Sequence, residues 1–374
     1  MPFPFEFMST PTMANEQYEK GKIKLSYTKN QIKRAGENIR KNENIEESIK
    51  IIRNFRAAHL YPLTIIKNLL WKHAQKIKPD PIIARRLKRL PTIIDKLTRK
   101  TLDGVNNNSI SIVRMQDIGG CRIIFENKDL LLKFNQSLNN SRTVHKTKVI
   151  NDYILNSKKT GYRGIHRVYH CYSNLQQHDW KGFLVEVQLR TKLQHLWATT
   201  VEIVDLCEGK ALKTNPFSSD IEWVEFFQIM SDFLANDDGF LFLKSEQMKS
   251  MKTRLEFLNF RLKAIDKLLS FNTVFSNTNL IKDSNKNQYI VLAIDNFKKR
   301  IYCSSYSKKF DALAVYSKIE DEKEHIGLFV EIDDIKNLQN AYPNYLIDTR
   351  LFVEKFYQYT TTNYWVNPKN KISL

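Results

Sequence analysis

The sequence predicts an α+β fold, in which a mixed β-sheet is flanked by helices and a smaller α/β unit follows. Three observations predict it. Apolar residues recur at helical spacing between residues 28 and 97, and short strand-like segments begin only afterwards. These strands are mixed with helical segments without a regular βαβ repeat. Residues 270–290 are polar and rich in Asn and Ser, which is typical of a linker or long loop.

The first part of the predicted domain is helical. Thr28 or Asn30 can cap the first helix, apolar residues recur at helical spacing over residues 45–59, and Pro62 opens a third helix. Another helix begins near Pro91. Residues 1–25 form a loosely ordered arm in this prediction.

Three segments have the composition of strands, at residues 121–125, 168–172 and 183–189, and a helix is predicted at 130–138. The third strand alternates, so one of its faces is apolar and the other polar. The polar face carries Glu186, Gln188 and Arg190.

The remaining elements divide the chain. Breakers at residues 236–239 precede a helical stretch at about 241–269. Beyond the linker, short strands (289–293, 301–303, 326–332), a helix (312–319) and terminal helices are predicted. We therefore expect domains at residues 26–270 and 271–374.

The positive charge is concentrated in the first part of the chain. Residues 1–200 contain 36 Lys and Arg against 16 Asp and Glu, whereas residues 201–374 contain 23 against 24. Such a field attracts nucleotides, RNA or acidic lipid, although a soluble basic surface without a specific ligand is the simpler alternative. No apolar run is long enough to span a membrane. The four cysteines form no C-x-x-C pair, so a cytoplasmic, reducing location is expected.

Two motifs, one basic and one acidic, have side chains suited to phosphate groups and their metal ion. Arg86, Lys88 and Lys96, with Thr92 between them, offer the several cations that a triphosphate needs, although a solvated helix face would look similar. Asp117 precedes a Gly-Gly turn and the strand that carries Arg122. Carboxylates at such strand edges often hold Mg²⁺, although Asp and Gly are also ordinary turn residues.

Two further motifs can receive an acceptor. Residues 158–166 (KKTGYRGIH) form a basic loop in which a base could stack on Tyr162, unless the loop is an ordinary surface turn. Glu186, Gln188 and Arg190 would be costly to bury without partners, although one face of an antiparallel sheet is often wet.

Together, in this order and spacing, the four motifs resemble the synthetase domain of RelA/SpoT proteins, which make (p)ppGpp. The resemblance covers about residues 80–205 and implies a nucleotidyltransferase-like mixed sheet flanked by helices. It implies that ATP donates pyrophosphate to a ribose 3′-hydroxyl in the presence of Mg²⁺. The family's roles fall on residues of three kinds: Arg86, Lys88, Thr92, Lys96 and Arg122 for ATP; Asp117 and Glu186 for catalysis and Mg²⁺; Lys158, Tyr162, His166, Gln188 and Arg190 for the acceptor.

The acceptor and the second unit leave alternatives open. The chain is similar to fused toxin–antitoxin members of the CapRel type, which implies transfer to the 3′ end of tRNA, inhibition of translation and release by a phage protein that binds a C-terminal regulatory domain. Tyr342 and Tyr345 match a short Y-x-x-Y motif that blocks the ATP site there, although ordinary core tyrosines would look the same. A (p)ppGpp synthetase acting on GDP or GTP is the second hypothesis, and a catalytically inactive binding module is the third.

Overall fold

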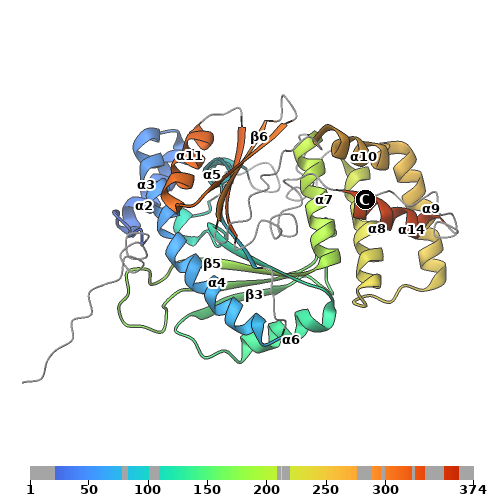
Figure 1. Cartoon of the computed structure of the whole chain (residues 1–374), viewed down its shortest axis with the longest axis horizontal. Coiled ribbons are helices and arrows are strands. Elements are labelled where there is room, and N and C mark those ends of the chain that lie inside the picture. Colours follow the sequence, from blue (N-terminus) through green and yellow to red (C-terminus); the bar gives the residue numbers. More distant parts are fainter. Residues whose placement is uncertain are drawn as a thin grey trace, which may run out of the picture.

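The computed structural model describes residues 22–77, 83–100, 109–208, 212, 220–275, 288–295, 300–321, 325–332 and 349–361. Tyr342 and Tyr345 lie outside these residues. The described part contains a central sheet with helices beneath it, a helical bundle at one side and a small second sheet above (Figure 1). No helix in the described ranges is long and apolar enough to cross a bilayer.

The central sheet has five strands in the order β1-β2-β5-β4-β3. Their bounds are β1 Ile83–Leu87, β2 Gly119–Phe125, β3 Lys146–Asp152, β4 Ile165–His170 and β5 Leu184–Thr191. β2 and β5 are parallel, and all other neighbours are antiparallel. The predicted mixed sheet flanked by helices is therefore confirmed. The basic motif is not a single solvated helix face, because Arg86 lies on β1 and Lys88 follows that strand, while Thr92 and Lys96 lie on the helix after it.

Helices cover one face of this sheet. They are α2 (Lys29–Lys41), α3 (Ile45–Ala58), α4 (Leu60–Gln75) and α6 (Lys128–Asn139), and α5 (Leu90–Thr98) lies at the end of β1. Thr28 caps α2 through a capping box with Gln31, as one of the two predicted caps required. Figure 1 shows α4 and α6 beneath the strands. The polar motifs lie on the opposite face of the sheet.

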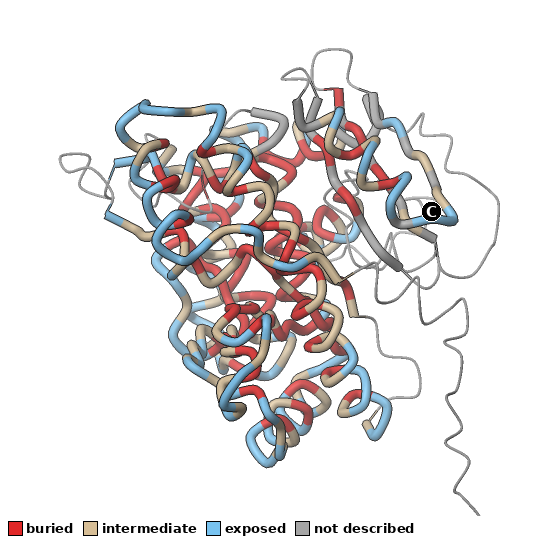
Figure 2. The backbone as a smooth tube through the Cα atoms, turned by 90° about the vertical axis from the view of Figure 1, so that its left-hand side faces the viewer, coloured by how far each residue is buried: buried red, intermediate tan, exposed pale blue. Residues whose placement is uncertain are grey.

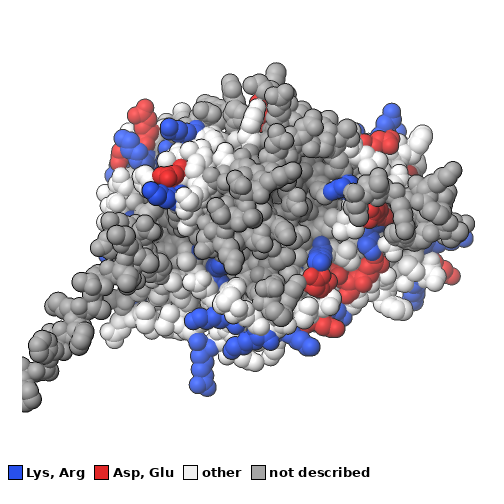
Figure 3. Space-filling view, in the orientation of Figure 1, with Lys and Arg blue, Asp and Glu red and all other residues white. Residues whose placement is uncertain are grey.

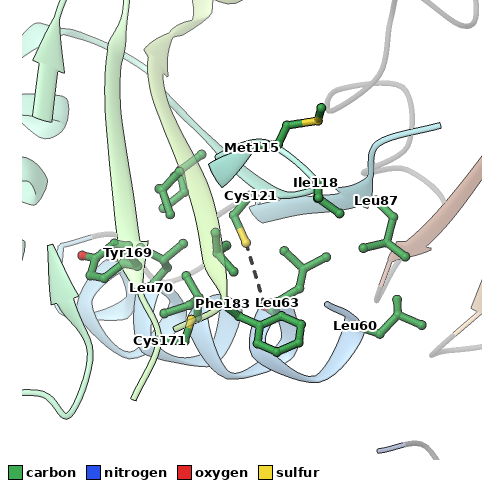
Figure 4. Packing of buried hydrophobic residues seen from close by; sticks show 14 of the residues in the cluster. Leu60, Leu63, Leu70, Leu87, Met115, Ile118, Cys121, Tyr169, Cys171 and Phe183 are labelled. Carbon is green, nitrogen blue, oxygen red and sulfur yellow. Dashed lines mark hydrogen bonds between the residues drawn. The ribbon is translucent and has the colours of Figure 1, made fainter. Parts of the chain in front are cut away.

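A single apolar core joins the sheet to these helices. Cys121 on β2, Tyr169 on β4 and Leu63 and Leu70 on α4 all belong to it (Figure 4). Figure 2 shows the buried backbone concentrated along the middle of the molecule. Burying this many apolar side chains fixes the register of each strand, because a slip by one residue would turn the core face toward solvent.

The helical bundle has a second core. It consists of α7 (Lys192–Glu208), α8 (Ile221–Asp237), α9 (Ser245–Leu262), α10 (Ala264–Phe275) and α14 (Arg350–Thr360). The predicted stretch 241–269 is divided at Lys263, which has a left-handed backbone conformation. The terminal helix α14 packs in this bundle and not on the small sheet. The predicted boundary at residue 270 stays a prediction, and the bundle takes helices from both sides of it.

The small sheet is formed by β6 (Gln288–Asp295), β7 (Arg300–Tyr306) and β8 (His325–Ile332), in the order β7-β6-β8, with α11 (Lys309–Asp321) packed on it. A small second α/β unit was predicted, and the structure has one. Phe329 of this unit lies against Leu60 and Leu87, so the unit rests beside β1.

Candidate active site

The strand register aligns residues of all four predicted motifs on one face of the central sheet. Arg86 on β1 pairs with Gly120 on β2, and Gly120 pairs with Glu186 on β5. One step along, Arg122 pairs with Gln188, which in turn pairs with His166 on β4. Side chains two residues apart on a strand share a face. The motifs therefore meet although up to 100 residues separate them in the chain.

An open cleft of about 80 Å³ lies on this face. Asp117 and Glu186 both line it, which brings together the two acids that the sequence predicted to meet. The other predicted residues in its wall are Arg86, Lys88, Arg122 and Gln188. Thr92 and Lys96 lie in α5, whose N-terminus follows Lys88 by two residues. Helix N-termini attract phosphate groups, so this end of the cleft suits a triphosphate.

Two lysines hold Asp117. Lys88 Nζ lies 3.0 Å from Asp117 Oδ2, and Lys96 Nζ lies 2.9 Å from Oδ1. Burial alone would raise the pKa of Asp117, but the two ammonium groups outweigh it and lower that pKa to about 2. Burial also lowers the pKa of Lys88, which Asp117 partly offsets. The aspartate is therefore ionised at neutral pH.

The acceptor residues form a closed ring of hydrogen bonds. His166 Nδ1 lies 2.9 Å from Glu186 Oε1, and the Tyr162 hydroxyl lies 2.5 Å from His166 Nε2. Arg190 donates to the Tyr162 hydroxyl (3.0 Å) and to Gln188 Oε1 (2.9 Å). Gln188 Nε2 closes the ring on Glu186 Oε2 at 2.8 Å. All five predicted members of this network therefore contact one another.

The ring has one arrangement of protons that satisfies every member. Burial lowers the pKa of His166, so its imidazole is neutral at pH 7, although the bond to Glu186 opposes this. A neutral imidazole donates from one nitrogen and accepts at the other. The carboxylate of Glu186 requires a donor, so Nδ1 carries the proton and Nε2 accepts from Tyr162. Glu186 is left as an ionised acceptor.

Tyr162 is more deeply buried than a residue that stacks on an acceptor base needs to be. Its side chain is 3% exposed, and Lys158 Nζ lies 5.2 Å from its ring centroid and 4.4 Å from that of Tyr153. Arg190 lies 5.1 Å from the same Tyr162 centroid. A base can stack on Tyr162 only after Lys158 moves, so this stacking stays a prediction.

The donor set fits Mg²⁺ in a limited way. Among the residues that the structure describes, no group of three or more His, Cys, Asp or Glu side chains could hold a metal. Mg²⁺ is usually held by one or two carboxylates together with substrate phosphates and water, and Asp117 with Glu186 provides that number. The two lysines would have to part from Asp117 first, and the phosphates of a nucleotide are the groups that attract them.

Sequence reasoning missed the residues that fix the acceptor loop. Arg163 lies inside the recognised motif, but its guanidinium points to α8, where it bonds Ser231 and Asp232. Neither partner belongs to a motif. The signal that could have found Ser231 and Asp232 is the burial of the charged Arg163 beside Tyr162. A single sequence does not reveal that burial.

Comparison with known proteins agrees with this geometry. The family model described as "Region found in RelA / SpoT proteins" matches residues 85–203, which contain every predicted ATP, acceptor and metal residue. The match is confined to this segment, which is about a third of the chain. The curated GTP pyrophosphokinase YjbM of Bacillus subtilis (strain 168) is 30% identical over 130 residues, which are 35% of this chain. The chain spans 58% of the length of that relative.

Solved structures of similar proteins include two from Bacillus subtilis. Small alarmone synthetase 1 has 22% identity, with 48% of this chain and 87% of that chain covered and a TM-score of 0.38. Small alarmone synthetase 2 has 18% identity, with 50% and 94% covered and a TM-score of 0.38. The residues matched by the family model end at 203, so α8 to α14 lie beyond them.

Proposed function

We propose that this protein is an ATP-dependent pyrophosphokinase that modifies a ribose 3′-hydroxyl, and that its preferred acceptor is the 3′ end of tRNA. The observation that carries the proposal is the common cleft of Asp117 and Glu186, with arginines and lysines on one side and the hydrogen-bonded acceptor ring on the other. The matched RelA/SpoT region and the GTP pyrophosphokinase relative support the reaction class.

The residues divide the reaction between them. Arg86 and Arg122 bind the adenine, while Lys88, Thr92 and Lys96 bind the phosphates. The acceptor oxygen attacks the β-phosphorus of ATP, the bond from that phosphorus to the α–β bridging oxygen breaks, and AMP leaves. Glu186 takes the hydroxyl proton, which its ionised state permits. Asp117 and Glu186 would hold Mg²⁺, which would neutralise charge on the phosphates when bound.

The His166–Tyr162–Arg190 part of the ring keeps Glu186 ready for this role. His166 fixes one carboxylate oxygen and Gln188 fixes the other, so the group cannot rotate away from the acceptor. Positioned groups of this kind account for much of the rate enhancement in phosphoryl transfer.

A cluster of lysines favours a polynucleotide acceptor over a free nucleotide. Lys146 pairs with His170 across the β3–β4 ladder. Burial lowers the pKa of His170, and the charges of Lys148, Lys29, Lys181 and Lys146 lower it further, so four lysines lie near this histidine. No carboxylate of the described residues forms an ion pair with any of the four. His170 shares a face of β4 with His166, four residues or about 13 Å away. The phosphates of a tRNA chain could reach these cations, whereas GDP alone has no group to place there.

The alternative is a (p)ppGpp synthetase with GDP or GTP as acceptor. The relative's name, GTP pyrophosphokinase, favours it. Incubation of the full chain with γ-labelled ATP and either tRNA, GDP or GTP separates the two. Label on tRNA supports the first reading, and label on guanosine nucleotides alone refutes it. The full chain is used because α14 belongs to the bundle core.

The residues after 270 are proposed to regulate this activity as an antitoxin-like unit that a phage protein releases. If Tyr342 and Tyr345 block the ATP site, the double variant Tyr342→Ala and Tyr345→Ala should be more toxic to cells than the parent. Equal toxicity at equal protein level would refute the role of these tyrosines. The same cells measured for translation would show whether toxicity follows its inhibition.

A further inference from the structure

The loop that carries Tyr162 is held from behind by α8. Arg163 Nη2 lies 2.6 Å from Asp232 Oδ1, and its Nε donates to Ser231 Oγ at 3.1 Å. Ser231 Oγ in turn donates to the carbonyl of Gly161 at 2.6 Å. The Nη1 of Arg163 donates to the carbonyl oxygen of Ile154, at the start of the loop. The guanidinium, 6% exposed as a side chain, therefore joins both ends of the loop to one helix turn.

The backbones of loop and helix are also in contact. Gly161 has φ +90°, and a Cβ placed on it would lie 3.0 Å from the Cα of Gln228 and 3.3 Å from the carbonyl oxygen of Phe227. No other residue fits there without displacing one of the two elements. The position of the loop is thus determined by the position of α8.

The helix is itself fixed at its C-terminal end. Asp237 accepts hydrogen bonds from Lys355 Nζ (2.7 Å) and the Tyr359 hydroxyl (2.6 Å) of α14. Asp238, at its C-cap, accepts from Thr191 at 2.5 Å, and Thr191 follows Arg190 at the end of β5. Every one of these contacts lies on the acceptor side. No hydrogen bond or ion pair of the described residues joins α8 to β1, β2 or α5, which carry the predicted ATP residues.

We propose that Arg163 is a positioning residue for the acceptor, acting through α8. It does not touch the reacting atoms. It holds Tyr162 where the tyrosine hydroxyl bonds His166, and His166 in turn bonds Glu186. The inference rests on the proposed function of that site. Loss of this support lowers affinity for the acceptor and leaves ATP binding as it is.

The test compares two carboxylates of the same helix. Asp232→Ala removes the partner of Arg163, whereas Glu225→Ala removes a carboxylate that pairs with Arg254 of α9 (2.7 Å) and lies away from the loop. Loss of a charged hydrogen bond is expected to raise the acceptor KM about tenfold in Asp232→Ala. The KM for ATP should not change, and Glu225→Ala should leave both constants at the parent values.

Amide hydrogen exchange provides a readout that does not depend on activity. Residues 158–164 should exchange faster in Asp232→Ala than in Glu225→Ala, with β1 and β2 equally protected in both. Asp232→Asn, which keeps an oxygen acceptor, should fall between the parent and Asp232→Ala. Equal exchange in the two alanine variants, or equal changes in both KM values, overturns the inference. If the parent modifies no acceptor at all, the proposed function fails, and exchange alone still decides whether Arg163 positions the loop.

Discussion

The substitution Asp117→Asn should separate the contribution of this carboxylate to stability from its contribution to turnover. In the free protein, Asp117 neutralises Lys88 and Lys96, and its pKa is lowered from 3.8 to about 2. A shift of that size corresponds to about 2 kcal/mol of stability held by the ionised carboxylate. Asparagine removes this charge and leaves two half-buried ammonium groups side by side. The variant should therefore unfold more readily at pH 7.

The size and pH dependence of that loss are both measurable. For a chain of this length, about 2 kcal/mol lowers the midpoint of thermal unfolding by roughly 2–3 °C. The folded pKa is depressed, so the contribution is fully present above the unfolded value of 3.8 and is lost as the pH falls through about 2. Denaturant unfolding of both proteins from pH 7 downward should show curves that converge only below about pH 4.

Turnover should fall far more than stability. At a temperature where both proteins are folded, Asp117→Asn should lose several orders of magnitude in turnover, because a carboxylate proposed to hold Mg²⁺ against the phosphates is gone. A variant as stable as the parent over the whole pH range would refute the ion pairs. A folded variant with retained turnover would refute the assignment of Asp117 to the reaction.

Two further variants test the other side of the cleft. Glu186→Gln should fold normally and lose turnover by orders of magnitude, since an amide can neither take the acceptor proton nor hold Mg²⁺ as a carboxylate does. Normal turnover would remove Glu186 from the mechanism. Lys146→Glu combined with Lys148→Glu should weaken tRNA binding and flatten its dependence on salt, because fewer counterions are released. Matched changes at Lys249 and Lys252 on α9 serve as the control, and equal losses in both pairs would mean that the lysine cluster is not the binding surface.

Much of the site could be predicted because its signals are local. The alternation of β5 placed Glu186, Gln188 and Arg190 on one face from period alone, and the structure confirms their common side. The Asp117 motif likewise led correctly to a strand edge, although Gly119 and Gly120, which were predicted to form a turn, are the first two residues of β2. Which residues close the ring around Glu186 was a matter of resemblance and not of pattern.

The elements that the sequence did not predict have no periodic signal. β1 consists of Ile-Ala-Arg-Arg-Leu, whose Arg85 and Arg86 project to opposite faces, one to Thr64 on α4 and one to the cleft. The short edge strand β3 is half exposed along its whole length and carries lysines. Its pairing with β4 overrides a weak local preference.

The return of α14 into the bundle could not be read from the sequence either. Phe352 and Phe356 pack against Phe226, more than 120 residues earlier, with ring centroids 6.4 and 6.1 Å apart. Apolar residues at helical spacing predict a buried face, but they do not name the face that covers it. This packing is what carries the end of the chain to the rear of the acceptor loop.

The small sheet meets the opposite half of the site, and one arginine makes the contact testable. Arg56 of α3 donates to the backbone carbonyl of Lys88 at 2.6 Å and to the hydroxyl of Tyr316 on α11 at 2.8 Å. Tyr316 is buried, so its hydroxyl holds this guanidinium where it supports the phosphate-binding strand end. Tyr316→Phe leaves the packing in place and removes that bond.

The expected result is opposite to that for Asp232→Ala, because the KM for ATP should change and the acceptor KM should not. A lost hydrogen bond of about 1 kcal/mol should raise the KM for ATP about fivefold and leave the acceptor KM unchanged. Tyr302→Phe, on the exposed side of the same unit, is the control and should change neither constant. If Tyr316→Phe altered the acceptor KM instead, Arg56 would not link the small sheet to the ATP side. Among the described residues after 270, α14 would then remain as a route to the site, through α8.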